Sequence, residues 1–474
     1  MYSRRAFLAA LPAVFSLRGA QGRRPPNILF FLTDDQRWDA AGFMGNRILR
    51  TPAADRLASS GVVFTNAFVT TSICMSSRAS ILTGLYERCH HINLFTTPLT
   101  DAQFQNSFPG LLRAAGYRTG YVGKWGIGDE RKESSRYDYF RAFRGQGELL
   151  MQQEGKTIGS SRLLSAQARE FLRGCAKNQP FCIQVSYNSP HAQDNAPWQY
   201  LYEPAHAAWY KDAVIPVPET ANPAQWPKFP QSVQRSELRR RWAPRFATPE
   251  LFQESLRSYF RLITEIDESM GEILAELSKL GLDDNTVVIF ASDNGYYYGE
   301  YGFADKWLMH EPSIRIPMFL YDPRMRGGGK RISQMALNID IAPTILELAG
   351  VPAPPSMQGR SLMPLVRGGA SAWRRDWFYE HSYRHQGWIP ATEGVRTTRW
   401  KYTRYIDTQP LFEELFDLAS DPLEKRNLAG DSTHAARLEN LRARWQTWVR
   451  ALENWRPTAP WREPDPTSLA ALGD

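Results

Sequence analysis

The sequence predicts an α/β protein, in which helices flank a large, mostly parallel sheet and a smaller antiparallel α+β domain follows. Continuous apolar runs such as residues 27–33 and 286–291 are typical of strands that are buried on both faces of a parallel sheet. Helical patterns alternate with these runs as far as residue 350 or so, as expected for a helix-covered parallel sheet. From about residue 365, short aromatic strands follow one another without helices between them, which indicates a small antiparallel sheet.

The chain of 474 residues is too long for one simple core, and we expect three parts. An export signal occupies residues 1–24, the α/β domain residues 25–365 and the C-terminal domain residues 366–474. Within the α/β domain, residues 192–249 are rich in proline and tryptophan and show little periodicity. So long an irregular insertion is typical of a functional loop or lid.

Residues that favour helix starts bound several of the expected elements. Thr51 and Ser107, each close to a proline, and Asp340 are typical N-caps, and Pro249 opens a long helix. We expect strands at residues 27–33, 117–122, 181–187, 286–291 and 316–321, and then at 377–381, 394–397, 400–405 and 413–417. We expect a short helix that begins at residue 52. Further helices are expected at residues 107–116, 163–172, 249–280, 339–348 and 433–452.

The N-terminus resembles a twin-arginine export signal. Arg4 and Arg5 precede an apolar run at residues 8–17, and small and basic residues follow, so cleavage is expected near residues 20–24. The run is shorter than the ~20 residues that span a bilayer, and no later run reaches that length. We therefore expect a bacterial protein without stable membrane insertion, exported to the periplasm or the extracellular space.

Composition is that of a soluble globular protein, with 43% hydrophobic and 22% charged residues. The formal charge of +8 comes from 57 basic and 49 acidic residues and is spread thinly along the chain. The densest basic run, residues 239–241, is as short as the solvated charge runs of many proteins. The charge weakly favours anionic substrates, and we expect no nucleic-acid partner.

Four cysteines are present, at Cys74, Cys89, Cys175 and Cys182. They allow three disulfide pairings in an oxidising compartment, and the sequence does not choose among them. No Cys-x-x-Cys spacing indicates zinc. Cys182 lies within an apolar strand pattern and is interpreted as a buried thiol.

Polar residues follow two of the predicted strands. Asp34 and Asp35 come after the strand at 27–33, and Asp293 and Asn294 come after the strand at 286–291. Parallel strands bring their carboxyl ends to one edge of a sheet, where open α/β sheets bind ligands. Oxygen ligands of this kind suit calcium or magnesium, and three carboxylates together need a cation. Taken singly, each pair is an ordinary polar strand end. Charged residues also follow the other strands, at Lys124, His191 and Lys306.

A polar stretch at residues 72–84 runs into the start of a helix and places Cys74 in its first turn. The free amides of a first helical turn bind anions, and Arg78, four residues on, adds a planar fork for tetrahedral oxyanions. Taken alone, the stretch also fits a capped helix that holds an ordinary small residue.

These residues together resemble the type I sulfatase family of the alkaline-phosphatase superfamily. Its signature is a cysteine, any residue, proline or alanine, any residue and arginine, continuing to Thr-Gly. Here the signature reads Cys74-Met75-Ser76-Ser77-Arg78 and Thr83-Gly84. Further matches are Pro26-Asn27-Ile28, Asp34-Asp35-Gln36, Gly123-Lys124-Trp125, Ser189-Pro190-His191, Ser292-Asp293-Asn294-Gly295, Lys306, His310-Glu311, Arg399-Trp400-Lys401-Tyr402, Glu414-Leu415-Phe416-Asp417 and Asp421-Pro422. The matches span residues 26–430.

The resemblance implies that Cys74 is oxidised to formylglycine, or 3-oxoalanine, by a separate formylglycine-generating (sulfatase-modifying) enzyme. It implies a calcium ion held by Asp34, Asp35, Asp293 and Asn294 together with residue 74. One hydroxyl of the hydrated aldehyde, a gem-diol, would attack the sulfur of a sulfate ester. The other hydroxyl would then expel sulfate and restore the aldehyde.

The resemblance also implies roles for basic residues. Arg78, Lys124 and Lys306 would neutralise charge on the sulfuryl oxygens. His191 and Lys306 would lie near the leaving oxygen, where one of them can donate a proton. His310 is expected to bind substrate.

The sequence departs from the family pattern at two positions. Ser76 stands where the modifying enzyme normally meets proline, which puts efficient conversion of Cys74 in doubt. Gly126 replaces the histidine that helps relatives eject sulfate. Either another histidine, such as His90, His91 or His310, substitutes, or sulfate release is slow.

The predicted activity is hydrolysis of a sulfate ester, with a sulfated carbohydrate or an aryl sulfate as substrate. Residues 139–147 and 307–311 are similar to N-acetylglucosamine-6-sulfatases, and aromatic residues of the 192–249 insertion offer surfaces for sugar stacking. Two alternatives remain open. One is a phosphodiesterase or phosphonate monoester hydrolase of the same superfamily, and the other is a non-catalytic binder of sulfated glycans.

Overall fold

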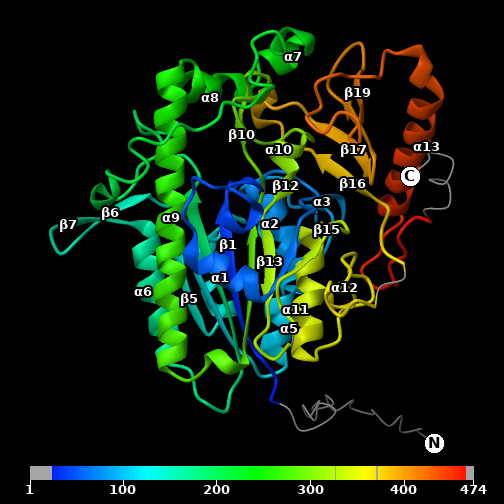
Figure 1. The fold of residues 1–474 in the computed structure, drawn as a ribbon. Helices are drawn as coiled ribbons and strands as arrows, with labels where there is room; N and C mark the ends of the chain where they lie inside the picture. The colour runs from blue at the N-terminus through cyan, green and yellow to red at the C-terminus, as the bar shows by residue number, and fades with distance from the viewer. Residues whose placement is uncertain (1–23, 326, 370–371, 466–474) are drawn as a thin grey trace, which may run out of the picture.

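The computed structural model describes residues 24–325, 327–369 and 372–465, so the predicted export signal lies outside the described residues except for its last residue. A large sheet of eight strands forms the centre, in the order β14-β2-β13-β9-β1-β8-β4-β5 (Figure 1). In chain order its strands are β1 (Asn27–Asp34), β2 (Val62–Phe64), β4 (Arg118–Lys124), β5 (Tyr139–Phe143), β8 (Phe181–Pro190), β9 (Thr286–Ser292), β13 (Met318–Tyr321) and β14 (Lys330–Ile332).

The central strands of this sheet are parallel. β1 pairs in parallel with β8 and β9, and β4 pairs in parallel with β8 and β5. β13 runs antiparallel to both β9 and β2. The predicted fold class is therefore confirmed, and the carboxyl ends of β9, β1, β8 and β4 meet at one edge of the sheet.

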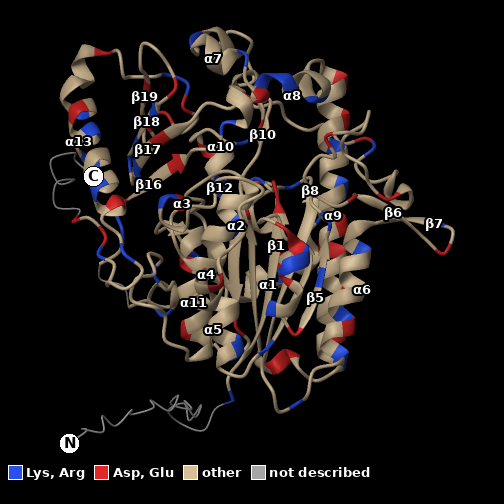
Figure 2. Cartoon of the chain, turned by 180° about the vertical axis from the view of Figure 1, so that it is seen from behind, with Lys and Arg blue, Asp and Glu red and all other residues tan. Residues whose placement is uncertain are grey.

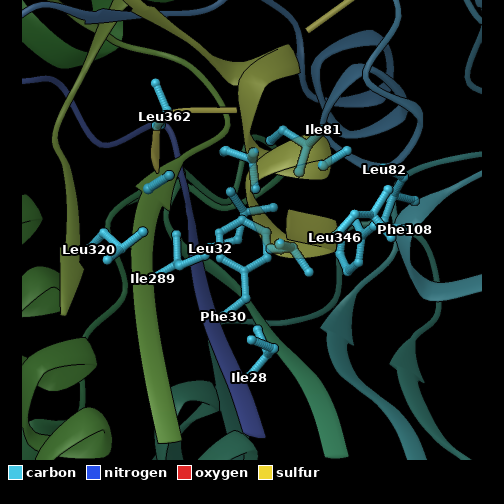
Figure 3. Packing of buried hydrophobic residues seen from close by; sticks show 14 of the residues in the cluster. Ile28, Phe30, Leu32, Ile81, Leu82, Phe108, Ile289, Leu320, Leu346 and Leu362 are labelled. Atoms are coloured by element: carbon cyan, nitrogen blue, oxygen red, sulfur yellow. The ribbon is translucent and has the colours of Figure 1, made fainter. Parts of the chain in front are cut away.

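Helices cover both faces of the large sheet, because β1 is apolar on both sides. Leu29 and Phe31 pack into the cluster under α1, α6 and α9, whereas Phe30 and Leu32 pack into the cluster under α2, α5 and α11 (Figure 3). Alternate residues of a strand point to opposite faces, so a run buried on both must be apolar throughout. These helices are α1 (Pro52–Ser60), α2 (Cys74–Thr83), α5 (Phe108–Ala114), α6 (Ser160–Arg173), α9 (Pro249–Lys279) and α11 (Ile341–Ala349).

A four-stranded antiparallel sheet lies beyond the carboxyl end of the large sheet in the view of Figure 1, and one long helix covers it. The indole of Trp448 and the guanidinium of Arg444 both donate hydrogen bonds to Asp376, which ties the helix to the first strand. The elements are β16 (Asp376–His381), β17 (Thr392–Thr397), β18 (Trp400–Tyr405), β19 (Phe412–Asp417) and α13 (Ala435–Glu453). The predicted antiparallel sheet with its covering helix is present, whereas the domain boundary near residue 365 stays a prediction.

Shorter elements complete the described chain. The small strands are β3 (Ala67–Phe68), β6 (Leu150–Gln153), β7 (Lys156–Gly159), β10 (Tyr297–Tyr298), β11 (Ala304–Asp305), β12 (Arg315–Ile316) and β15 (Ala336–Leu337). The short helices are α3 (Glu87–His90), α4 (Asp101–Gln105), α7 (Gln231–Gln234), α8 (Glu237–Phe246), α10 (Glu311–Ile314) and α12 (Met363–Val366). Helix α8 lies in the insertion where the sequence shows little periodicity, since Pro244 and a run of arginines obscure its pattern.

The helix starts differ in detail from the sequence prediction. Thr51 stands at the N-cap position of α1, but its hydroxyl donates to Asp55. The amides of Ala53 and Ala54 instead donate to the carboxylate of Asp267, which lies on α9. A capping group more than 200 residues away leaves no local signal in the sequence.

The surface charges and the cysteines of the chain show no special arrangement among the described residues. Basic and acidic side chains are interspersed along α6 and α13 (Figure 2). All four cysteines are free thiols. Within the described ranges, no helix combines the length and the apolar character needed to cross a membrane.

Candidate active site

Acidic and amide side chains meet where β1 and β9 end. Asp34 is the last residue of β1, and Asp35 follows it. Asp293 and Asn294 follow β9, the parallel neighbour of β1. The Asn294 amide donates to Asp35 Oδ1 at 2.6 Å, and the Asp35 backbone N–H donates to Asp293 Oδ1 at 3.2 Å. All four side chains are fully buried. The structure therefore brings together the four residues that the sequence predicts as metal ligands.

Three oxygens of this group are buried and accept no hydrogen bond from any described residue. They are Asp34 Oδ1, Asp35 Oδ2 and Asn294 Oδ1. Ligand atoms of Asp34, Asp35 and His191 also lie within 4.8 Å of one another. Buried oxygens without partners are costly, and hard oxygen donors of this kind suit calcium. The donor set therefore fits the ion that the family resemblance implies.

The carboxylates differ in their electrostatic environment. Burial, the charge of Asp34 and that of Asp35 raise the pKa of Asp293 to about 7, against the opposing effect of Arg78. Burial also acts to raise the pKa of Asp34, but Lys124, His191 and Arg78 outweigh it and hold that pKa far below its usual range. The crowding of negative charge at Asp293 is what a bound cation would relieve.

Two basic side chains close the site from the side of β4 and α2. Lys124, the last residue of β4, places Nζ 2.5 Å from Asp34 Oδ2. Arg78 on α2 donates from Nε to Asp293 Oδ2 at 2.9 Å and from Nη1 to the Lys124 carbonyl at 2.7 Å. Its Nη2 is buried and has no hydrogen-bond partner in the described chain. One edge of a fixed guanidinium is thus left to bind an anion.

Lys306 lies on the opposite side of the acids, directly after β11. Its ammonium pairs with Asp35 and is 3.4 Å from Asp305 Oδ1. Burial acts to lower the pKa of Lys306, but Asp35 and Asp305 outweigh it and raise that pKa well above its usual value. The two neighbouring carboxylates therefore favour the charged form of Lys306.

Cys74 is the first residue of α2 and lines a cavity of about 810 Å³, together with His191 and Lys306. The thiol is 4% exposed, and burial raises its pKa. The first turn of α2 carries no acidic residue, so its amides keep their attraction for anions. Cys74 therefore lies at the wall of the cavity, close to Lys124 and Lys306.

His191 follows β8 and is oriented by its own chain. Its Nδ1 lies 2.6 Å from the carbonyl oxygen of Ala192, so Nδ1 carries a proton and donates. Its Nε2 lies 3.6 Å from Asp35 Oδ2. The ring is nearly buried but lines the cavity, with Nε2 as the nitrogen that can exchange a proton.

The other predicted histidines do not line this cavity. His90 accepts from the Ile92 N–H at Nδ1 and contacts the Ser80 hydroxyl at Nε2, and both contacts are buried. His310 is 2.7 Å from the Tyr297 hydroxyl and belongs to a buried network with Glu414. The structure therefore does not bring His90, His91 or His310 to the cavity.

Gly126 lies against Arg78. Its φ of +77° is left-handed, and a Cβ at this position would be 3.1 Å from Arg78 Cδ. The backbone conformation and the contact with Arg78 thus favour glycine at this position in this chain.

Several cavity residues, among them Gln146, Phe95 and His385, have no counterpart in the sequence prediction of the site. The Gln146 amide donates to Asp34 Oδ2 at 3.0 Å, and Gln146 lies in the 139–147 stretch that stands out in the sequence. Phe95 and His385 line the mouth of the cavity from loops. Neither loop carries a periodic pattern, so only the motif stretch around Gln146 offered a signal.

The fold and the clustered groups define an α/β protein of the alkaline-phosphatase superfamily. The family model described as Sulfatase matches residues 26–351, and a model described as N-sulphoglucosamine sulphohydrolase, C-terminal, matches residues 299–450. The chain therefore belongs to the sulfatase family, whose members are sulfuric ester hydrolases.

Relatives and solved structures agree with this membership. An N-acetylglucosamine-6-O-sulfatase of Bacteroides thetaiotaomicron is 27% identical over 88% of this chain and 85% of its own. An arylsulfatase of Clostridium perfringens is 26% identical over 88% and 93%. A structure solved with its substrate D-glucosamine-2-N,6-O-disulfate has a TM-score of 0.80 at 24% identity, covering 92% of this chain and 99% of that one. A phosphonate monoester hydrolase of Agrobacterium radiobacter shares the fold, with a TM-score of 0.70 at 21% identity over 90% and 95%.

Proposed function

We propose that this protein hydrolyses a sulfate ester on a sulfated carbohydrate, with a calcium ion and a formylglycine derived from Cys74. The observation that carries the proposal is the set of three buried, unpartnered oxygens on Asp34, Asp35 and Asn294, next to a cysteine that lines the cavity. Asp293 is the fourth proposed ligand. The carbohydrate is supported by the relative that is named an N-acetylglucosamine-6-O-sulfatase and by the substrate in the similar structure.

The basic residues would hold the sulfate group. When bound, calcium supplies positive charge that polarises the ester, and a formylglycine at position 74 supplies the oxygen nucleophile. Arg78 offers Nη2 to one sulfate oxygen, since this nitrogen makes no hydrogen bond in the described chain and lies 3.9 Å from Asp34 Oδ2. Lys124 and Lys306 keep their charge, because Asp34 and Asp35 raise their pKa values against the effect of burial. These fixed charges match the charge that develops on the sulfuryl oxygens.

His191 is the proposed proton donor to the leaving oxygen. Its Nδ1 proton is committed to the Ala192 carbonyl, which leaves Nε2 to carry and release the exchangeable proton. Lys306 is already engaged by two carboxylates, because its ammonium pairs with Asp35 and lies 3.4 Å from Asp305 Oδ1. We therefore assign proton transfer to His191 and charge neutralisation to Lys306.

Sulfate release is the step for which this chain lacks the histidine that the family resemblance leads us to expect at position 126. No histidine stands at Gly126, and His90, His91 and His310 do not line the cavity. His385 does line it, but its Nδ1 contacts the Tyr383 hydroxyl at 3.1 Å. We propose that release limits turnover. A rapid-quench measurement should then show a burst of the released alcohol in the first turnover, and a linear time course without a burst would contradict slow release.

Conversion of Cys74 is the direct test of the proposed function. The protein is co-expressed with a sulfatase-modifying enzyme, and the mass of the tryptic peptide that carries residue 74 is measured. Conversion to the aldehyde, with hydrolysis of glucosamine 6-O-sulfate, supports the proposal. An unmodified thiol with retained sugar binding would instead indicate a non-catalytic binder.

Substrate choice separates the proposal from its closest alternative. Solved structures of phosphonate monoester hydrolases share this fold, so an aryl sulfate and an aryl phosphonate are assayed in parallel with the converted protein. Faster turnover of the phosphonate would overturn the sulfatase assignment. We also propose export through the paired arginines Arg4 and Arg5, which replacement of both by lysine tests in a fractionated bacterial culture.

A further inference from the structure

Two aromatic rings stand at the mouth of the catalytic cavity. Phe95 lies in the loop after α3, and Tyr383 lies in the loop after β16, and both line the cavity that holds Cys74. The rings are perpendicular, with centroids 5.4 Å apart and an interplanar angle of 89°. Phe95 is 43% exposed, so much of its apolar face is open to solvent.

The loops that carry these rings are tied together beside them. The Asn93 amide donates to the Ser382 hydroxyl at 3.0 Å, and Ser382 in turn donates to Glu87 on α3. Each aromatic residue lies within two positions of one of these contacts. The pair is thus held in place by polar contacts of its neighbours, which is the preorganisation that a binding surface requires.

The outer edge of the pair is polar. The Tyr383 hydroxyl lies 3.1 Å from His385 Nδ1, and His385 also lines the cavity. An apolar ring face with hydroxyl and imidazole groups at its edge suits a sugar, which presents C–H faces and a rim of hydroxyls.

The size of the cavity gives a second, independent indication. Its volume of about 810 Å³ lies near the upper end of the roughly 300–1,000 Å³ of small-molecule sites. Cys74 and Lys306 are buried residues of its lining, whereas Phe95 is 43% exposed, so Cys74 and Lys306 mark the floor of the cavity and Phe95, with its partner Tyr383, marks the mouth. One sulfated sugar at the floor leaves the mouth free for a second ring.

We propose that Phe95 and Tyr383 bind a second sugar ring, so that the substrate is a sulfated oligosaccharide rather than a monosaccharide. This inference rests on the proposed function, because it assumes that the floor of the cavity binds the sulfated sugar. The second ring stacks on the exposed face of Phe95 and bonds to the hydroxyl of Tyr383. These two residues then determine specificity without touching the reacting atoms.

Binding to the unconverted protein tests the inference without turnover. Protein with the Cys74 thiol intact is titrated calorimetrically with glucosamine 6-O-sulfate and with a disaccharide that contains it. The wild type should bind the disaccharide about 10-fold more tightly, the gain expected of one aromatic contact with its polar edge. Phe95→Ala should remove most of this gain and leave monosaccharide binding unchanged, and Tyr383→Phe should remove a smaller part.

Trp388 provides a matched control. It lies five residues after Tyr383, is also 43% exposed, and does not line the cavity. Trp388→Ala should change neither affinity. Phe95→Leu, which keeps apolar bulk without an aromatic face, should resemble Phe95→Ala if the ring itself binds the sugar.

Each contrary outcome has a distinct meaning. Equal affinity of the wild type for both sugars, or equal weakening of both by Phe95→Ala, overturns the inference and leaves the proposed function standing. Failure of the wild type to bind either sugar overturns the proposed sugar and this inference with it. In the converted enzyme, Phe95→Ala should raise KM for the disaccharide about 10-fold at unchanged kcat.

Discussion

Restoring the family's histidine at position 126 should damage this protein rather than improve it. Gly126→His places a side chain on a backbone with a φ of +77°, which costs an L-residue about 1–2 kcal/mol. Its Cβ would lie 3.1 Å from Arg78 Cδ, closer than ordinary contact. Arg78 cannot move freely, because it donates to Asp293 and to the Lys124 carbonyl.

The magnitude follows from these two contributions. A shift of Arg78 by a few tenths of an ångström weakens its hydrogen bonds at a cost of about 1 kcal/mol, so the total is about 2–3 kcal/mol. Gly350→Ala is the matched control, because Gly350 has a φ of +70° and no atom within 4 Å of a Cβ. The control should lose only the backbone contribution of about 1–2 kcal/mol.

Urea-induced unfolding, followed by tryptophan fluorescence, measures these losses, and aryl sulfate hydrolysis measures turnover. We expect Gly126→His and Gly126→Ala to lose more stability than Gly350→Ala and to turn over more slowly than the wild type. A Gly126→His variant that is as stable as the wild type and releases sulfate faster would refute the reasoning.

Three further changes test the site and the core. Arg78→Met leaves Asp293 Oδ2 without its donor and removes one of the three donors to the Lys124 carbonyl, which the Tyr121 and Ser186 hydroxyls also bind. Because the Asp293 carboxylate is buried, the free energy of unfolding should fall by about 3–5 kcal/mol, and a loss below about 1 kcal/mol in urea would contradict the buried pairing. Calcium should raise the melting temperature relative to EGTA. A calcium concentration of about 100 times Kd adds about 2.7 kcal/mol to the free energy of unfolding, and an unchanged melting temperature would argue against the site. His381 is fully buried with both ring nitrogens unpartnered among the described residues, and burial lowers its pKa to about 3. This pKa lies below the value of about 6.5 in the unfolded chain, so between pH 6.5 and pH 3 only the unfolded chain binds the proton. The free energy of unfolding is therefore undiminished by His381 above pH 6.5 and falls as the pH is lowered towards 3. Relative to the wild type, His381→Leu should therefore be about 2 kcal/mol more favourable at pH 5 than at pH 7.5, and equal differences at the two pH values would contradict this.

The central strands could be predicted because burial on both faces demands continuous apolar residues. The same reasoning located Asp34 and Asp293, since parallel strands that are neighbours must end at one edge. The edge strand β14 and its neighbour β2 could not be predicted in this way, because each is only three residues long and β14 is also partly charged. The cap of α1 was also out of reach, because Asp267 supplies it from another helix.

The candidate site divides in the same manner. Residues that belong to motifs, such as Lys124 and His191, lie where the sequence predicted them, next to the acids. Residues that act through loop geometry, such as Phe95 and His385, have neither periodicity nor a motif to mark them. His310 belongs to a motif but lies in a buried network and does not line the cavity, so its expected role in substrate binding stays a prediction.

Ser76 connects the two parts of the site. Its buried hydroxyl donates to the Ile92 carbonyl at 2.8 Å, at the start of the loop that carries Phe95. Neither proline nor alanine, the usual residues of the signature, has a side chain that could donate this bond. The departure at position 76 therefore has a structural reason in this chain, independent of whether Cys74 is converted. The bond joins the helix that begins at Cys74 to the loop that carries Phe95.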